Sequence, residues 1–107
     1  MSIIAGLSNA EEAMICAVLQ SYPQVQEARV FGSRALGRAQ PYSDIDLALW
    51  GDISTPVLAA IAGELEELPL PYRFDVLAVE SLHHLPLREH IERVGKSFYR
   101  HAPALTV

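Results

Sequence analysis

The stretch VFGSRALGRAQPYSDIDLALW, residues 30–50, decides the fold that we expect. A short β-rich run over residues 28–31 leads into it and ends at Gly32. The polar, Gly-containing segment from Ser33 to Tyr42 predicts a turn or a short helix followed by a loop. The segment over residues 43–50 then alternates for several residues, with Ile45, Leu47 and Leu49 on one face, which predicts a strand with one apolar face. The stretch therefore predicts two strands joined by a Gly-Ser turn and a loop.

Helical patterns flank this stretch on both sides. Before it, Ser8 and Glu11 form a capping-box pattern ahead of an apolar stripe, which predicts a helix over about residues 9–21. After it, apolar residues at three- and four-residue steps predict a helix over residues 56–68 that packs against the sheet. A β-rich run over residues 72–79 and a helix over residues 86–94 follow. We expect Gly95 to end that helix in a left-handed conformation, before a short tail strand at residues 98–99.

Length and charge limit the classes of function. The 107 residues, half of them hydrophobic, fit a single domain over residues 1–107. The formal net charge is −5, and the basic residues are scattered, so direct binding of nucleic acid is disfavoured. No stretch approaches the roughly 20 apolar residues that span a bilayer, so we expect no membrane contact.

Cys16 is the only cysteine, which excludes an internal disulfide and indicates the reducing cytoplasm.

Three aspartates suggest a metal site. Asp44 and Asp46 are one residue apart on a predicted strand, so their side chains leave the same face, and Asp75 lies in the next β-rich run. If all three converge, each like-charged pair near 4 Å would cost on the order of 4 kcal/mol at an effective dielectric of 20, which a bound cation would offset. Oxygen ligands alone favour Mg²⁺ or Mn²⁺ over zinc. The alternative is that the Asp-x-Asp pair is a solvated strand end.

The Gly-Ser turn is a candidate phosphate site. Gly32 would let the backbone come close to a phosphate, and Ser33 offers a hydroxyl and an N–H at the start of a short helix. The alternative makes Gly32 a turn residue and Ser33 a helix cap. Arg34 is a candidate for charge-assisted hydrogen bonds to a triphosphate, the alternative being a solvated loop arginine.

The order of these parts resembles the DNA polymerase beta-like nucleotidyltransferase superfamily, and especially its minimal nucleotidyltransferase (MNT) branch. The matching parts are Gly32-Ser33 after a strand, the Ser43-Asp44-Ile45-Asp46-Leu47 strand, a helix, and a strand with Asp75. The resemblance implies an α+β nucleotidyltransferase fold, in which helices pack on a small mixed sheet of about three core strands.

The resemblance also implies the roles of the residues. ATP would be the substrate, and a hydroxyl would attack its α-phosphate in line, with Mg²⁺ held by the protein. The residues implied as catalytic and metal-binding are Asp44, Asp46 and Asp75, and those implied to contact the nucleotide phosphates are Gly32 and Ser33. Arg34 and Ser43 are further nucleotide-binding candidates.

A partner protein is implied in the same way. Chains resembling this one are typically encoded beside a small helical HEPN-domain protein, often a ribonuclease toxin, and act as antitoxins by transferring AMP to a toxin tyrosine. Two alternatives stay open. One is a non-catalytic subunit that binds nucleotide and neutralises a HEPN partner. The other is transfer to a small hydroxylated molecule bound by a homodimer.

Overall fold

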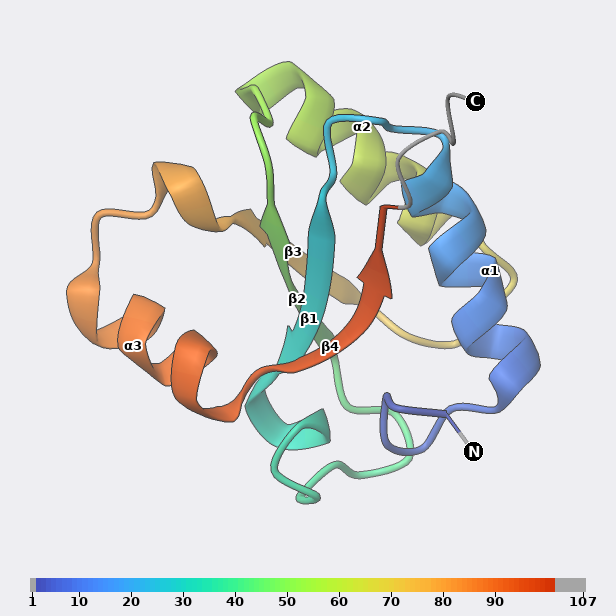
Figure 1. Ribbon diagram of the computed structural model, residues 1–107. Coiled ribbons are helices and arrows are strands. Elements are labelled where there is room, and N and C mark those ends of the chain that lie inside the picture. Colours follow the sequence, from blue (N-terminus) through green and yellow to red (C-terminus); the bar gives the residue numbers. More distant parts are fainter. Residues whose placement is uncertain (1, 102–107) are drawn as a thin grey trace, which may run out of the picture.

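The computed structural model describes residues 2–101 and places a four-stranded sheet between helices (Figure 1). The strands run in the order β3-β2-β1-β4 across the sheet. In chain order the elements are α1 (Asn9–Gln20), β1 (Glu27–Phe31), the 3₁₀ turn η1 (Gly32–Arg34), β2 (Ile45–Trp50), α2 (Thr55–Glu66), β3 (Phe74–Ala78), the 3₁₀ turn η2 (Val79–Ser81), α3 (Leu85–Val94) and β4 (Lys96–Arg100). No helix within residues 2–101 is long and apolar enough to cross a membrane.

The sheet is mixed, as expected. Strand β1 pairs antiparallel with both β2 and β4, whereas β2 and β3 run parallel and are connected through α2. A parallel pair needs such a crossover because its second strand must start at the same end of the sheet as the first. The expected tail strand is a full edge strand, β4, so the sheet has four strands rather than about three.

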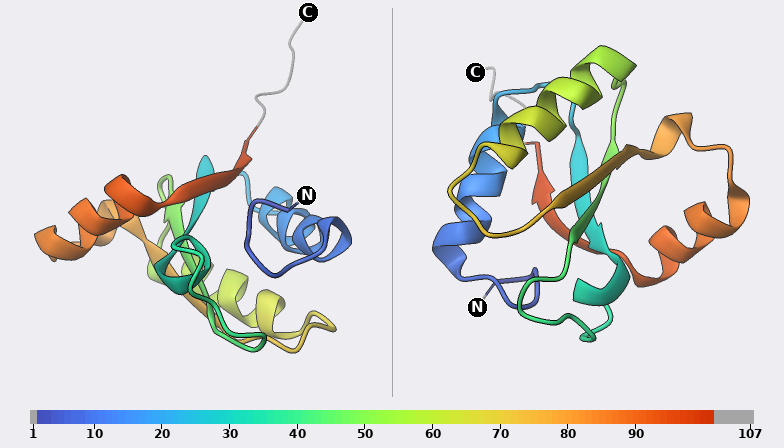
Figure 2. Two further views of the ribbon diagram at one scale, coloured as in Figure 1. Left: turned by 90° about the horizontal axis from the view of Figure 1, so that it is seen from below. Right: turned by 180° about the vertical axis from the view of Figure 1, so that it is seen from behind.

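The two faces of the sheet are covered differently. Helices α1 and α2 lie on one face and α3 lies on the other (Figure 2). Strand β2 shows the division, since Ile45, Leu47 and Leu49 join the core beneath α1 and α2, whereas Ala48 packs with Ile91 of α3. Burying one such aliphatic side chain contributes about 1.5–3 kcal/mol, so the larger cluster under α1 and α2 dominates stability.

Local signals explain where the helices begin and end. Ser8 accepts a hydrogen bond from the Glu11 N–H while the Glu11 carboxylate accepts one from the Ser8 N–H, so the expected capping box is present. Gly95 ends α3, but its φ of −63° is not left-handed, and that expectation was wrong. A Cβ on Gly95 would overlap the Ile91 carbonyl oxygen, so close packing, rather than a positive φ, accounts for glycine here.

Candidate functional site

Asp46 lies where three segments meet. Its Cα is the partner of Phe31 across the antiparallel β1–β2 ladder and of Asp75 across the parallel β2–β3 ladder. Residues paired in adjacent strands project from the same face, about 4.8 Å apart. Asp46 and Asp75 therefore leave the sheet together, beside the point where β1 passes into Gly32.

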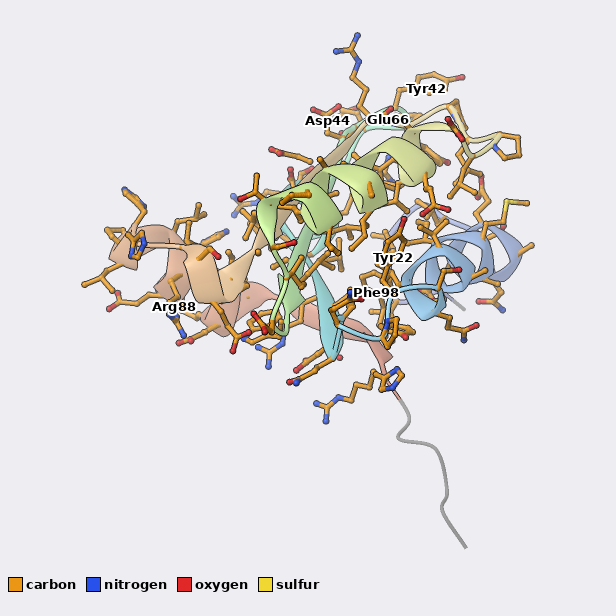
Figure 3. All side chains as sticks on the ribbon, turned by 90° about the horizontal axis from the view of Figure 1, so that it is seen from above. Tyr22, Tyr42, Asp44, Glu66, Arg88 and Phe98 are labelled. Carbon is orange, nitrogen blue, oxygen red and sulfur yellow. The ribbon has the colours of Figure 1, made fainter. Side chains whose placement is uncertain are left out.

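Asp44 approaches the same place from a loop. It precedes β2, which begins at Ile45, so only Asp46 of the predicted pair belongs to the strand. Asp44 and Asp75 are exposed, and Asp46 is half-buried. Figure 3 shows Asp44 at the same end of the molecule as Tyr42.

The surroundings of Asp46 disfavour the ionised form of its carboxyl group. Burial, followed by the negative charges of Asp75 and then Asp44, raises the pKa of the Asp46 carboxyl above its ordinary value. Both neighbouring carboxylates therefore disfavour the ionised form of Asp46. This is an environment in which a divalent cation would stabilise the ionised form.

The donor set fits Mg²⁺ or Mn²⁺ because it consists of carboxylate oxygens. Within residues 2–101, however, no three side chains of His, Cys, Asp or Glu are arranged closely enough to form a ready metal site. Two exposed carboxylates flanking a half-buried one can turn towards a cation, whose charge would relieve their repulsion. The metal site therefore stays a prediction, with Asp46 as its most fixed member.

Gly32 is required by the carboxylate beside it. Its φ is +71°, in the left-handed region that side-chain-bearing residues rarely adopt. A Cβ at Gly32 would overlap Asp46 Oδ2 and lie 3.2 Å from Asp46 Cγ. The close approach that the sequence suggested for a phosphate is thus made in this structure by the Asp46 side chain. The half-buried Ser33 follows Gly32 in η1, and its contact with nucleotide stays a prediction.

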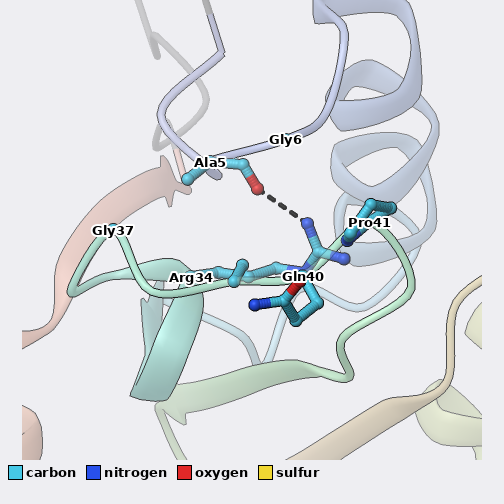
Figure 4. Close-up of a pocket in the computed structure, with 7 residues that line it drawn as sticks. Ala5, Gly6, Arg34, Gly37, Gln40 and Pro41 are labelled. Carbon is cyan, nitrogen blue, oxygen red and sulfur yellow. Dashed lines mark hydrogen bonds between the residues drawn. The ribbon is translucent and has the colours of Figure 1, made fainter.

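Arg34 lies inside the protein instead of in a solvated loop. Its relative exposure is 1%, and its guanidinium donates to the Ser43 carbonyl from Nε at 3.2 Å and from Nη2 at 2.7 Å. Nη1 donates to the Ala5 carbonyl at 2.7 Å (Figure 4). The Tyr72 ring covers the guanidinium at 4.7 Å. These contacts favour a structural role for Arg34 over the predicted contact with phosphate.

Ser43 closes the loop that leads to Asp44. Its hydroxyl accepts a hydrogen bond from the Gln40 N–H at 2.8 Å, and its own N–H donates to the Gln40 carbonyl at 3.1 Å. Ser43 therefore shapes the turn, and a contact with nucleotide stays a prediction. A pocket of about 390 Å³ lies against this loop, lined by Ala5, Gly6, Arg34, Gly37, Ala39, Gln40 and Pro41 (Figure 4). None of the three aspartates lines this pocket, so the candidate carboxylate site lies outside it.

Two residues near the carboxylates had no signal in the sequence. Glu66, at the end of α2, accepts a hydrogen bond from the Phe74 N–H at 3.0 Å and so fixes the start of β3 next to Asp75. Tyr72 covers Arg34 and donates to Glu11 at 3.5 Å. The Tyr72 contacts join residues far apart in the chain, and the Glu66 contact crosses from the end of a helix to the start of a strand, so periodicity reveals neither of them.

Comparison with known proteins agrees with this geometry. The family described as polymerase beta, nucleotidyltransferase matches residues 13–103, whereas no curated protein matches the chain. A solved toxin-antitoxin structure with AMP-PNP is similar at a TM-score of 0.72 and 24% identity, over 84% of this chain and 73% of that one. The toxin-antitoxin MntA-HepT is similar at 0.67 and 21%, over 88% and 74% of the two chains.

A third similar structure contains a modified toxin. It is a tri-AMPylated Shewanella oneidensis HEPN toxin in complex with an MNT antitoxin, similar at a TM-score of 0.68 and 20% identity over 89% of this chain and 74% of that chain. At these identities the likeness establishes the fold, which confirms the expected nucleotidyltransferase architecture.

Proposed function

The chain belongs to the polymerase beta nucleotidyltransferase family, and from that membership we propose that it transfers AMP from ATP to a hydroxyl group of a partner protein. The observation that carries the proposal is the position of Asp46, in register with Asp75 and next to the Gly32-Ser33 turn. This arrangement brings carboxylates and a phosphate-binding candidate to one point, as nucleotidyl transfer requires.

Each residue has a part in the proposed reaction. Asp44, Asp46 and Asp75 would hold Mg²⁺, which when bound neutralises charge that develops on the phosphates. Ser33 would hold the nucleotide phosphates, and Gly32 leaves room for the Asp46 carboxylate next to them. The acceptor oxygen bonds to the α-phosphorus, the bond to the bridging oxygen breaks, and pyrophosphate leaves. The exposed Asp75 would take the proton of the acceptor hydroxyl.

The proposed acceptor is a tyrosine of a HEPN-type toxin, and the proposed role is that of an antitoxin in the cytoplasm. Support comes from the similar MNT antitoxin, whose HEPN partner is tri-AMPylated, and from the similar complex with AMP-PNP. The exposed Asp44 and Asp75 would allow a protein side chain to reach the site from solvent.

The test is transfer of label from ATP carrying ³²P at the α-position. This chain is incubated with Mg²⁺ and with the HEPN-type protein that is proposed as its partner, and the labelled residue is found by peptide mass spectrometry. We expect Asp46→Ala to abolish labelling of the partner. Asp52→Ala is the control, because Asp52 is an exposed carboxylate in the loop that follows the other end of β2, away from Asp44 and Asp46. It should label the partner as the wild type does.

The other readings predict different results. A non-catalytic neutralising subunit would bind the HEPN protein and inhibit it without transferring label, and that outcome would refute the proposed enzyme. Transfer of label to small hydroxylated molecules, with none to the HEPN protein, would refute the protein acceptor and retain the nucleotidyltransferase.

A further inference from the structure

Arg34 stands apart from the other charged residues of the chain. Among residues 2–101 it is the only charged or polar residue in the buried class. An arginine stays protonated, so its burial is unfavourable unless its donors are satisfied and its charge is shared. Three of its five N–H groups donate to backbone carbonyls, and an aromatic ring covers it.

The contacts of Arg34 reach each segment that carries a site residue. Its own backbone follows Ser33 directly in η1. The carbonyl that receives two of its hydrogen bonds belongs to Ser43, and the next residue is Asp44. Tyr72 precedes β3, which begins at Phe74, and stands three residues before Asp75. One guanidinium therefore joins the turn, the loop and the segment that leads into β3.

The same contacts make a phosphate ligand unsuitable for Arg34. Although Arg34 lines the pocket beside this loop, only 1% of its surface is exposed, and three of its N–H groups already donate to the Ser43 and Ala5 carbonyls. Gly6 closes over it as well, since a Cβ on Gly6 would lie 2.7 Å from Nη1. The two carbonyls and the ring thus occupy the guanidinium on several sides.

We propose that Arg34 is a positioning residue, which holds the Asp44 loop against the Gly32-Ser33 turn and the start of β3 through the Ser43 carbonyl. The proposal rests on the proposed function for its catalytic consequence, but the positioning itself is a property of the protein without ligand. Lysine cannot replace it, because an ammonium is a point donor and lacks the planar fork that serves Ser43 and Ala5 together.

Amide hydrogen exchange in the protein without ligand tests the positioning. The reporter is the Ile45 N–H, which follows Asp44 and donates to the Arg73 carbonyl at 2.8 Å. Losing hydrogen bonds from a charged donor should make this amide exchange about 10- to 100-fold faster in Arg34→Lys, with the Leu49 amide unchanged. Tyr72→Leu removes the ring and leaves the Ser43 bonds, so we expect a smaller increase at Ile45. This variant decides the question if Arg34→Lys does not fold.

Arg29 supplies the matched control. Its guanidinium also lies over an aromatic ring, Trp50, at 4.5 Å, and its Nε also donates at 2.8 Å, but to Glu27. Arg29→Lys should leave the exchange of the Ile45 amide as in the wild type. Equal acceleration of Ile45 and Leu49 in Arg34→Lys would show a general loss of stability and overturn the proposal. Unchanged exchange at Ile45 would overturn it too.

Binding of Mn²⁺ together with ATP, measured by water proton relaxation, tests the consequence for the site. We expect Arg34→Lys to bind Mn²⁺ about tenfold or more weakly than the wild type, and Arg29→Lys to bind it within about twofold. Equal binding by Arg34→Lys and wild type would overturn the link to the site. A wild type that takes up no Mn²⁺ would count against the proposed function, and the exchange result would still decide the role of Arg34.

Discussion

Replacing Gly32 by alanine should show how tightly the turn packs against the carboxylate site. The substitution has two costs in the structure. The backbone at Gly32 has a φ of +71°, which is strained for alanine. The new methyl group would also overlap Asp46 Oδ2, so the Asp46 side chain must turn away.

Gly37 separates the two costs. Its φ is also +71°, but a Cβ there meets nothing within 4 Å. Gly37→Ala should therefore lower the free energy of unfolding by the backbone term alone, about 1–2 kcal/mol. Gly32→Ala should lower it by about 1–3 kcal/mol more, the usual range for overpacking. The two glycines share the same φ and differ in their surroundings.

Urea unfolding followed by fluorescence measures both values. Trp50 is the only tryptophan, is half-buried and lies under the Arg29 guanidinium, so its emission should change on unfolding. Asp46→Ala removes the atoms that the new methyl group would strike. In that background the excess cost of Gly32→Ala over Gly37→Ala should shrink towards zero, as in a double-mutant cycle.

Equal losses for Gly32→Ala and Gly37→Ala in the wild-type background would refute the reasoning. An excess cost that survives in Asp46→Ala would also refute it, because the overlap would then involve some other group.

Three further changes follow from the same structure. Burial and the charges of Asp75 and Asp44 raise the pKa of the Asp46 carboxyl in the folded protein. The protonated carboxyl therefore contributes its full stability at a pH below the pKa that it has in the unfolded chain, and this contribution is lost as the pH rises through its pKa in the folded protein. At neutral pH the Asp46→Asn variant should therefore be about 1 kcal/mol more stable than the wild type, a value that includes the weakening of these charges by solvent. Near pH 3 the two proteins should be equally stable, and thermal melts across this pH range measure the difference. Ser8→Ala removes the cap of α1 and should lower the free energy of unfolding by about 1 kcal/mol in urea titrations, with full retention of stability counting against the observed capping box. Leu65→Ala, at a fully buried position beneath the sheet, should lower it by about 2–5 kcal/mol in the same assay, and a loss below 1 kcal/mol would contradict the packing.

The sequence alone was sufficient to predict most of the helices and strands and to name the residues of the candidate site. Three elements lie within a few residues of their predicted positions: the helices Asn9–Gln20 and Thr55–Glu66 and the strand that ends at Trp50. Periodicity and caps are local properties, since they depend on residues within one or two turns of each other. The spacing of Asp44 and Asp46 and the Gly-Ser turn could be read for the same reason.

The tertiary structure decided how those elements meet. Two features of the site depend on contacts between separate segments of the chain. One is the parallel register that pairs Asp46 with Asp75, and the other is the close approach of Asp46 that leaves no room for a side chain at Gly32. The burial of Arg34 likewise needs Ala5, Ser43 and Tyr72 in place around it. A loop arginine in the sequence carries no sign of such partners, because contacts across long sequence separations form only when the chain packs. The sequence therefore identified the three aspartates. It did not show how they are arranged, or that a buried arginine lies behind them.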